Sequence, residues 1–245
     1  MSSPGYHPLE SADHPKEHHS HKTGSHTEPQ TSFFYPLATI SVFVTAVVIS
    51  FVYRQQDQGS YPVRATPPPY FFSIWGVIYA LTGLLLLYIL FSRHWTDRTH
   101  TWMMLTSMFS ILWVVLGFLG PIKAKPVLRW LALIMIVFSL LQVWRTILPE
   151  YYSTRGPYLF ARNIIAFYLG WATCASCIGL SIVSVYTIDC TQTAGVYVFW
   201  IAVATLILFM VAQAMQLKAL DGFVGFFLSA LWGIIGVIIG LSQTR

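Results

Sequence analysis

The sequence predicts an all-α, multi-pass membrane protein, a transmembrane bundle of about seven helices. Hydrophobic residues make up 56% of the chain and charged residues only 9%, whereas soluble domains carry roughly 25% charge. The charged side chains also gather between long apolar runs. This composition cannot build a water-facing surface, but a lipid bilayer accepts apolar side chains on the outside of a fold. The lipid bilayer is therefore the first partner that the sequence predicts.

Seven apolar segments define the expected helices. They cover residues 33–53, 70–91, 101–120, 127–148, 158–186, 194–217 and 222–241. Each is about 20 residues or longer, the length that an α-helix needs to cross a hydrocarbon core of roughly 30 Å. The connections are short, so helices that follow one another in the chain should pack antiparallel. The run Pro67-Pro68-Pro69 before the second segment predicts a stiff, extended lead into that helix.

Residues 1–32 have a different composition from the rest of the chain. They are rich in His, Ser, Pro and Glu, and they hold six of the eight histidines. Such a segment cannot bury enough apolar surface to offset the entropy of ordering, which predicts a disordered tail. The histidines from His14 to His26 could bind a divalent metal, but a solvated, pH-sensitive tail is the simpler interpretation, and no metal site is predicted.

The net charge of +5 does not indicate a nucleic-acid partner. Lys and Arg are spread singly or in pairs over the connections and form no basic stripe. They suit anchoring at lipid headgroups, as do the rings of Trp95, Trp102, Trp130 and Tyr152 near the expected helix ends. With seven crossings, eight Lys and Arg lie on the side of the N-terminus and six on the other. The positive-inside rule thus favours a cytosolic N-terminus, but the sequence does not identify the membrane.

The apolar segments contain no recognisable catalytic apparatus. None has Asp, Glu, Lys, Arg or His near its middle, where a charge costs roughly 2.5–3.5 kcal/mol and is kept only for function. Proton-coupled carriers and membrane hydrolases need such groups or an activated nucleophile. Cys174 and Cys177 have the spacing of a redox pair, but their apolar surroundings favour a role in helix packing. We therefore expect a protein that is not an enzyme.

Three motifs resemble the TspO/translocator family. Residues 67–79, PPPYFFSIWGVIY, resemble the start of that family's second helix, and more closely the longer tryptophan-rich relatives that read roughly P-P-G-Y-x-F-S-I-W-G-x-I-Y. Residues 168–175, YLGWATCA, look like the fifth helix's Y-L-x-W-x-T-x-A, and Leu112-Trp113 resembles the L-W of the third. The resemblance implies a TspO-like five-helix core over residues 33–186, followed by two additional transmembrane helices in residues 187–245.

Departures from the family pattern affect two intramembrane amides and a sterol motif. Ser110 stands where the family's third helix has Asn, and Gly179 stands where the fifth helix has Asn. Val185-Tyr186 begins a sterol-type pattern, but no Lys or Arg follows within five residues, so sterol recognition has no support in the sequence.

Aromatic residues are the candidate ligand-binding residues. Trp75 and Tyr79 are four residues apart and share one helix face. If Trp113 and Trp171 converge on this face, the rings would form a pocket for a flat, apolar molecule, with Tyr70 as a fifth candidate. The resemblance implies a tetrapyrrole or a similar lipophilic ligand, and a sensor or carrier function. The alternatives are rings that only pack helices together, a transporter of a small neutral solute, or a non-catalytic accessory or scaffold subunit of a membrane complex.

Small residues recur at four-residue spacing in the last apolar segment. Gly225, Ser229 and Gly233 form one such series, and Gly236 and Gly240 form another. Small side chains let two helix backbones approach closely in lipid. This face predicts close contact with a neighbouring helix or with a second protomer, which would make the protein a homo-oligomer.

Overall fold

A computed structural model describes residues 33–53, 61–92, 95–118, 124–147, 155–217 and 220–243, the side chain of residue 155 excepted. These residues form α1 (Phe34–Tyr53), α2 (Ile74–Ser92), α3 (Asp97–Phe118), α4 (Lys125–Thr146), α5 (Arg155–Tyr186), α6 (Gln192–Gln216) and α7 (Val224–Gln243), with 3-10 turns η1 (Pro69–Ser73) and η3 (Leu220–Phe223) before α2 and α7. All seven α-helices are long and apolar enough to cross a membrane. The predicted all-α, multi-pass fold is confirmed. The predictions for the tail of residues 1–32, including the histidines from His14 to His26, and for Tyr152 fall outside these ranges.

Local hydrogen bonds and prolines explain where several helices begin. Helix α3 begins at Asp97, earlier than the expected residue 101, because the hydroxyl of Thr96 accepts a hydrogen bond from the backbone N–H of Thr99. Thr191 caps α6 in the same way, accepting from the backbone N–H of Ala194. Before α2, Pro68 has φ −54° and ψ 149°. These are polyproline angles, as the sequence predicted for this lead.

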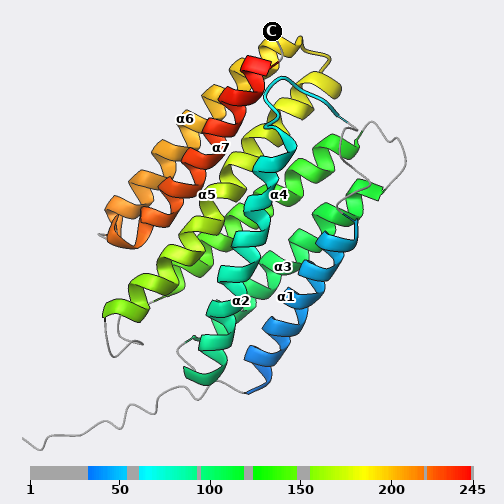
Figure 1. Ribbon diagram of the computed structural model, residues 1–245. Coiled ribbons are helices and arrows are strands. Elements are labelled where there is room, and N and C mark those ends of the chain that lie inside the picture. Colours follow the sequence, from blue (N-terminus) through cyan, green and yellow to red (C-terminus); the bar gives the residue numbers. More distant parts are fainter. Residues whose placement is uncertain are drawn as a thin grey trace, which may run out of the picture. The chain divides into compact units, whose positions relative to one another are not determined.

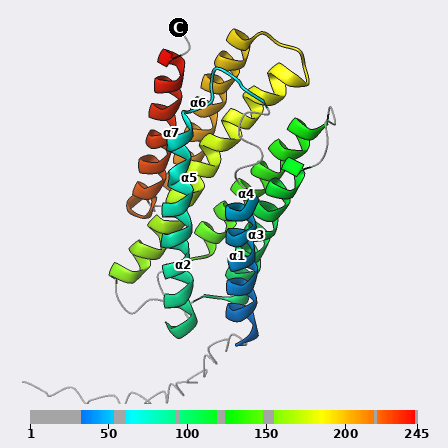
Figure 2. The same ribbon diagram turned by 45° about the vertical axis from the view of Figure 1, so that its right-hand side comes forward.

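Five helices form a closed ring, and two more pack outside it. The ring runs α1, α2, α5, α4, α3 and back to α1, since each of these neighbouring pairs is in contact. Helices α6 and α7 both pack against α5, on the side away from α1 and α3 (Figure 1, Figure 2). Helix α5 is therefore the central element: 83% of its most apolar stretch is buried, against 22% for α1.

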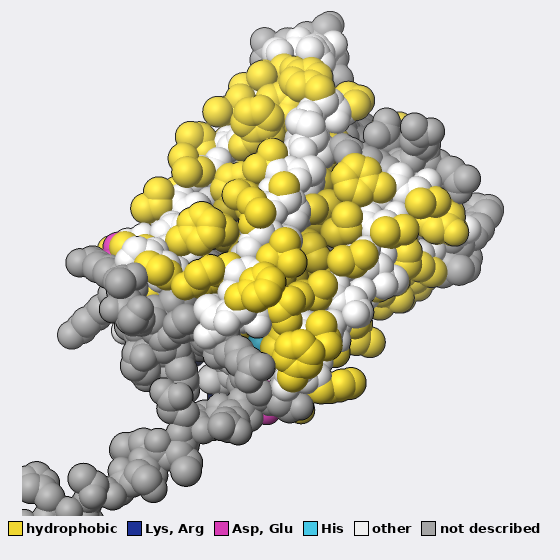
Figure 3. Space-filling view, turned by 60° about the horizontal axis from the view of Figure 1, so that its bottom comes forward, with side chains coloured by type: hydrophobic (Ala, Val, Ile, Leu, Met, Phe, Trp, Pro, Cys, Tyr) yellow, Lys and Arg dark blue, Asp and Glu magenta, His cyan; other side chains and the backbone are white. Residues whose placement is uncertain are grey.

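The outer surface of the described helices carries many large apolar side chains. Phe91 is 84% exposed, Leu208 70% and Ile201 67%, and hydrophobic side chains spread over the face shown in Figure 3. An apolar surface this extensive would aggregate in water but is the normal outer surface of a helical protein in lipid. The protein is an integral, multi-pass membrane protein.

Hydroxyl groups link the ring helices to one another. The hydroxyl of Thr106 on α3 donates to the hydroxyl of Ser139 on α4 over 2.9 Å. Ser110 occupies the position at which the TspO family pattern has Asn. Its hydroxyl lies 3.0 Å from the hydroxyl of Tyr168 on α5. In lipid such bonds contribute on the order of 1 kcal/mol each. Ser110 thus retains a polar contact between α3 and α5.

The small-residue face of α7 is covered inside the chain. A Cβ added to Gly170 of α5 would overlap the carbonyl of Phe226 on α7, and one added to Gly225 would overlap the carbonyl of Asn163 on α5. A Cβ at Gly233 would overlap the sulfur of Cys174. Gly225 and Gly233 therefore let α7 pack closely on α5, which is a neighbouring helix of the kind that this face was predicted to meet. Cys174 takes part in this packing.

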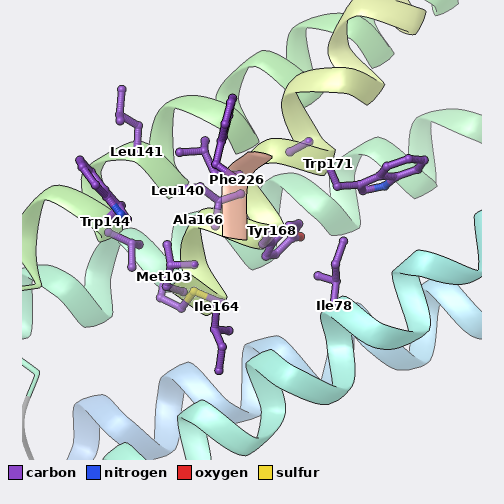
Figure 4. Packing of buried hydrophobic residues seen from close by; sticks show 14 of the residues in the cluster. Ile78, Met103, Leu140, Leu141, Trp144, Ile164, Ala166, Tyr168, Trp171 and Phe226 are labelled. Carbon is purple, nitrogen blue, oxygen red and sulfur yellow. The ribbon is translucent and has the colours of Figure 1, made fainter. Parts of the chain in front are cut away.

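Large rings fill the contact between α5 and its neighbours. Tyr168 and Trp171 extend from α5 near Ile78 of α2 (Figure 4), and all three side chains are buried to 98% or more, with exposures of 2%, 0% and 1%. Dense packing of this kind fixes the orientation of α2 relative to α5. It also fixes where the α2 side chains on either side of Ile78 point.

Candidate functional site

A cavity of about 570 Å³ opens at the end of the bundle where α1 and α3 end and α4 begins. Its volume lies in the usual range of small-molecule sites. Most of its wall is apolar or aromatic. The described residues that line it are Ser50, Phe51, Tyr53, Tyr61, Pro62, Val63, Thr66, Pro67, Pro69, Phe72, Trp75, Tyr79, Trp113, Val114, Phe118, Pro126, Arg129, Trp130, Leu133, Ala175, Ile178, Gly179 and Ile182.

Three of the predicted residues form a stack of rings along this cavity. The ring centroids of Trp75 and Tyr79 are 5.6 Å apart, as expected for neighbours on one helix face. Trp113 of α3 stacks on Trp75 with centroids 6.1 Å apart and planes 29° apart. The hydroxyl of Tyr79 donates to the hydroxyl of Ser50 on α1 over 3.0 Å, which connects this ring to α1.

Trp171 packs against this stack of rings but does not line the cavity. Its ring is fully buried. It meets Trp75 edge to face at 6.1 Å and Phe72 edge to face at 5.9 Å. The indole N–H of Trp171 has no hydrogen-bond partner among the described residues. The predicted convergence of Trp75, Trp113 and Trp171 is thus present in the structure, but only the first two reach the cavity.

Tyr70 lies away from the cavity. Its side chain is 58% exposed, and its ring packs beside that of Phe71 with centroids 4.9 Å apart. Phe72, two residues after Tyr70 in the same 3-10 turn, lines the cavity instead.

Sequence reasoning missed several residues of the wall, chiefly Arg129 and Trp130 on α4 and Gly179 on α5. Arg129 lies with its guanidinium carbon 4.8 Å from the ring centroid of Trp113, although the sequence suggested only a headgroup anchor. Trp130, expected to anchor at the membrane interface, lines the cavity. A Cβ at Gly179 would lie 3.2 Å from Trp130, so the glycine that replaces the family's asparagine leaves room for this indole. In the sequence, the only sign of these wall residues was the Arg129-Trp130 pair in the first turns of an expected helix.

Residues 61–69 close one side of the cavity, and α6 and α7 contact this segment and the turn η1 that follows it. The backbone N–H of Arg64 donates to the side-chain carbonyl of Gln192 on α6 over 3.2 Å. The indole N–H of Trp232 on α7 donates to the carbonyl of Phe71 over 3.2 Å. Gly236 and Gly240 of α7 leave room for this segment, since Cβ atoms there would come within 3.0 Å of Phe71 and Thr66. The two additional helices thus brace a wall of the cavity.

The described wall of this cavity presents surfaces suited to contact with an apolar molecule. Its described residues supply stacked rings, aliphatic surface, a few hydroxyls and the guanidinium of Arg129. Within the described part of the chain, no three His, Cys, Asp or Glu side chains come together as a metal site. Aromatic faces bind flat apolar molecules through dispersion and burial of apolar surface.

Comparison with protein families supports the resemblance found in the motifs. The family model described as TSPO-like protein matches residues 31–245. The match includes α6 and α7 as well as the five helices of the ring. No curated protein and no solved structure matches the chain at a significant level. Because the family model covers nearly the whole chain, the protein belongs to the TSPO-like protein family.

Proposed function

We propose that this membrane protein binds a flat, hydrophobic small molecule, a tetrapyrrole or a similar lipophilic compound, in the cavity along Trp75 and Trp113. The observation that carries the proposal is the stack of Trp75, Tyr79 and Trp113 along a cavity of about 570 Å³. A planar ligand laid against this stack would bury both of its faces on aromatic or aliphatic side chains.

The proposed role is that of a sensor or carrier and not that of an enzyme. The cavity wall provides no carboxylate, histidine or cysteine among its described residues, and these are the usual general acids, bases and nucleophiles. Ligand binding would stabilise the contacts of residues 61–69 with α5, α6 and α7. The same binding would transmit the presence of the ligand to the outer helices.

Quenching of tryptophan fluorescence by protoporphyrin IX tests the proposal. We expect saturable quenching of the purified full-length protein in detergent. The double variant Trp75→Leu with Trp113→Leu should weaken binding by at least about tenfold, because each aromatic contact contributes about 0.5–1.5 kcal/mol beyond its buried area. The control variant is Trp200→Leu, which changes a half-buried indole on α6 outside the ring of five helices. Equal affinity of the double variant and the wild type would contradict the site.

A transporter of a small neutral solute is the alternative function. Uptake of labelled solutes into proteoliposomes would reveal it. The aromatic lining of the cavity favours a lipophilic ligand over a hydrated solute, since a hydrated solute needs polar groups along its path. An accessory or scaffold role is tested by co-purification of partner proteins in mild detergent.

A further inference from the structure

We infer that α7 regulates the ligand site, because its docking on the cavity wall and the binding of a ligand stabilise one another. This inference rests on the proposed function and names the element through which the site is controlled. Three buried glycines in the second half of α7 carry it, namely Gly233, Gly236 and Gly240. Each lies against a residue that lines the cavity or that packs directly behind a lining residue.

Gly236 and Gly240 contact the wall of the cavity directly. A Cβ at Gly236 would lie 2.8 Å from the ring of Phe71 and 3.0 Å from Pro67. A Cβ at Gly240 would lie 2.6 Å from the carbonyl oxygen of Thr66. Pro67 and Thr66 both line the cavity. The backbone of α7 therefore touches the outer side of this wall, and in a densely packed contact a shift of one displaces the other.

Gly233 reaches the ring stack through one intermediate residue, Trp171. A Cβ at Gly233 would lie 2.4 Å from the sulfur of Cys174 and 3.4 Å from the indole of Trp171. Trp171 is fully buried and meets Trp75 and Phe72 edge to face. Both of these rings line the cavity. Trp171 is thus a positioning residue, since it packs against two rings that would touch the ligand and against α7 on its other side.

Trp232 connects α7 to the same wall by a hydrogen bond and a ring contact. Its indole N–H donates to the carbonyl of Phe71 over 3.2 Å, and the two ring centroids are 4.9 Å apart. Phe72, the next residue, lines the cavity. On the opposite face of α7, Leu231 is 54% exposed and Ile238 51%. The helix therefore contacts the cavity wall on one side and presents apolar side chains to lipid on the other.

The packing of the wall explains why ligand and helix stabilise one another. An empty cavity leaves the inner side of the wall without neighbouring atoms, so the wall residues lose part of their van der Waals contacts. A bound ligand supplies these contacts and limits the positions that Phe72 and Trp75 can take. A wall held in one position gives α7 one surface on which to pack. Because coupling between two sites is reciprocal, a firmly docked α7 raises ligand affinity by the same factor.

The first experiment measures ligand affinity after a mild loosening of α7. Trp232→Phe removes the hydrogen bond to Phe71 and keeps an aromatic ring. Protoporphyrin IX is titrated into the purified full-length protein in detergent, and the absorbance of the porphyrin gives the dissociation constant. We expect Trp232→Phe to weaken binding by about threefold or more. The matched control is Trp200→Phe, the same substitution at a half-buried position of α6, which should leave the constant unchanged.

A second pair of variants tests the steric contact of α7 with the wall. Gly236→Ala places a methyl group against Phe71 and Pro67 and should weaken porphyrin binding by about fivefold or more. Gly225→Ala overlaps the carbonyl of Asn163 on α5, and Asn163 is not among the described residues that line the cavity. This control should lower the melting temperature without a comparable loss of affinity.

The third measurement uses the unmodified protein and reports a change that a purely structural role of α7 would not produce. Hydrogen exchange of the backbone amides of residues 230–243 is followed by mass spectrometry with and without saturating protoporphyrin IX. We expect the porphyrin to slow exchange in this half of α7 by about threefold or more. Exchange in residues 197–212 of α6 is the internal control and should not change.

The outcomes distinguish this inference from the proposed function. Unchanged affinity in Trp232→Phe and in a folded Gly236→Ala, or unchanged exchange in α7, would overturn the inference while leaving the porphyrin site in place. An equal loss of affinity in either control variant would also overturn it, since it would show a general loss of structure. If Gly236→Ala does not fold, Trp232→Phe and the exchange measurement decide the question. Failure of protoporphyrin IX to bind the wild type would overturn the proposed function and this inference with it.

Discussion

The hydroxyl of Tyr186, the last residue of α5, donates a hydrogen bond of 2.8 Å to the backbone carbonyl of Pro62. The two rings of Tyr186 and Tyr61 also meet edge to face, with centroids 5.1 Å apart. This contact joins the central helix of the bundle to the segment that closes one side of the cavity. It makes the wall formed by residues 61–69 dependent on α5 as well as on the two outer helices.

Removal of this hydroxyl should loosen the segment without unfolding the bundle. A hydrogen bond of this type stabilises by about 1 kcal/mol, so Tyr186→Phe should increase the open population of residues 61–69 roughly fivefold. The measurement is the rate of trypsin cleavage after Arg64 in detergent, followed by mass spectrometry. Tyr197→Phe, which changes an exposed tyrosine of α6, is the matched control. A cleavage rate equal in both variants would show that the Tyr186–Pro62 bond does not hold the segment.

The space around two glycines predicts opposite effects of alanine substitution on the stability of the protein. Gly170→Ala would force a Cβ into the carbonyl of Phe226, so we expect it to destabilise the protein by about 1–3 kcal/mol. Gly76→Ala on α2 meets nothing within 4 Å and should stabilise the helix by up to about 1 kcal/mol. Thermal unfolding in detergent measures both. Equal melting temperatures for the two variants would contradict the described contact between α5 and α7.

Gly179 offers a way to fill the cavity from α5. A Cβ at this position already lies 3.2 Å from Trp130 and 3.3 Å from Leu133, so the longer side chain of Gly179→Leu must extend into the cavity space. We expect porphyrin affinity to fall by about tenfold or more. The control is Gly83→Leu on α2, where a Cβ lies at ordinary contact distance, 3.7 Å from Phe43, and Gly83 does not line the cavity. Unchanged affinity in a folded Gly179→Leu protein would place the ligand elsewhere.

Cys190 provides a native reporter of topology. It is half-buried in the connection between α5 and α6, whereas Cys174 and Cys177 are buried inside the bundle. With seven crossings, Cys190 and the N-terminus lie on opposite sides of the membrane. A cytosolic N-terminus therefore predicts that a membrane-impermeant maleimide, added to sealed vesicles with the cytosolic side outward, labels Cys190 only after detergent is added. Cys190→Ser is the control for labelling of the other two thiols. Rapid labelling of intact vesicles would reverse the predicted orientation.

Much of the fold could be predicted from the sequence because membrane crossing depends on local composition. Each helix needs about 20 consecutive apolar residues, and the seven segments identified in this way correspond to α1 through α7. Some observed helix ends differ by a few residues from the predicted ends, because a cap or a 3-10 turn lies there, as at Asp97 and at Pro69. The shared face of Trp75 and Tyr79 was also predictable, since it follows from helical periodicity alone.

The sequence alone thus indicated seven segments long and apolar enough to cross a membrane, a shared helix face for Trp75 and Tyr79, and a resemblance to the TspO family. Only the tertiary structure decided that Trp171 supports the ring stack from behind, that Tyr70 turns outward, and that Arg129 enters the cavity wall. It also decided that Gly225 and Gly233 of α7 pack against the chain's own α5, whereas Gly236 and Gly240 meet residues 66–71. The physical reason is that lipid is as apolar as a protein interior. Hydrophobicity along a transmembrane helix therefore does not reveal which face meets lipid, which meets another helix and which borders a cavity.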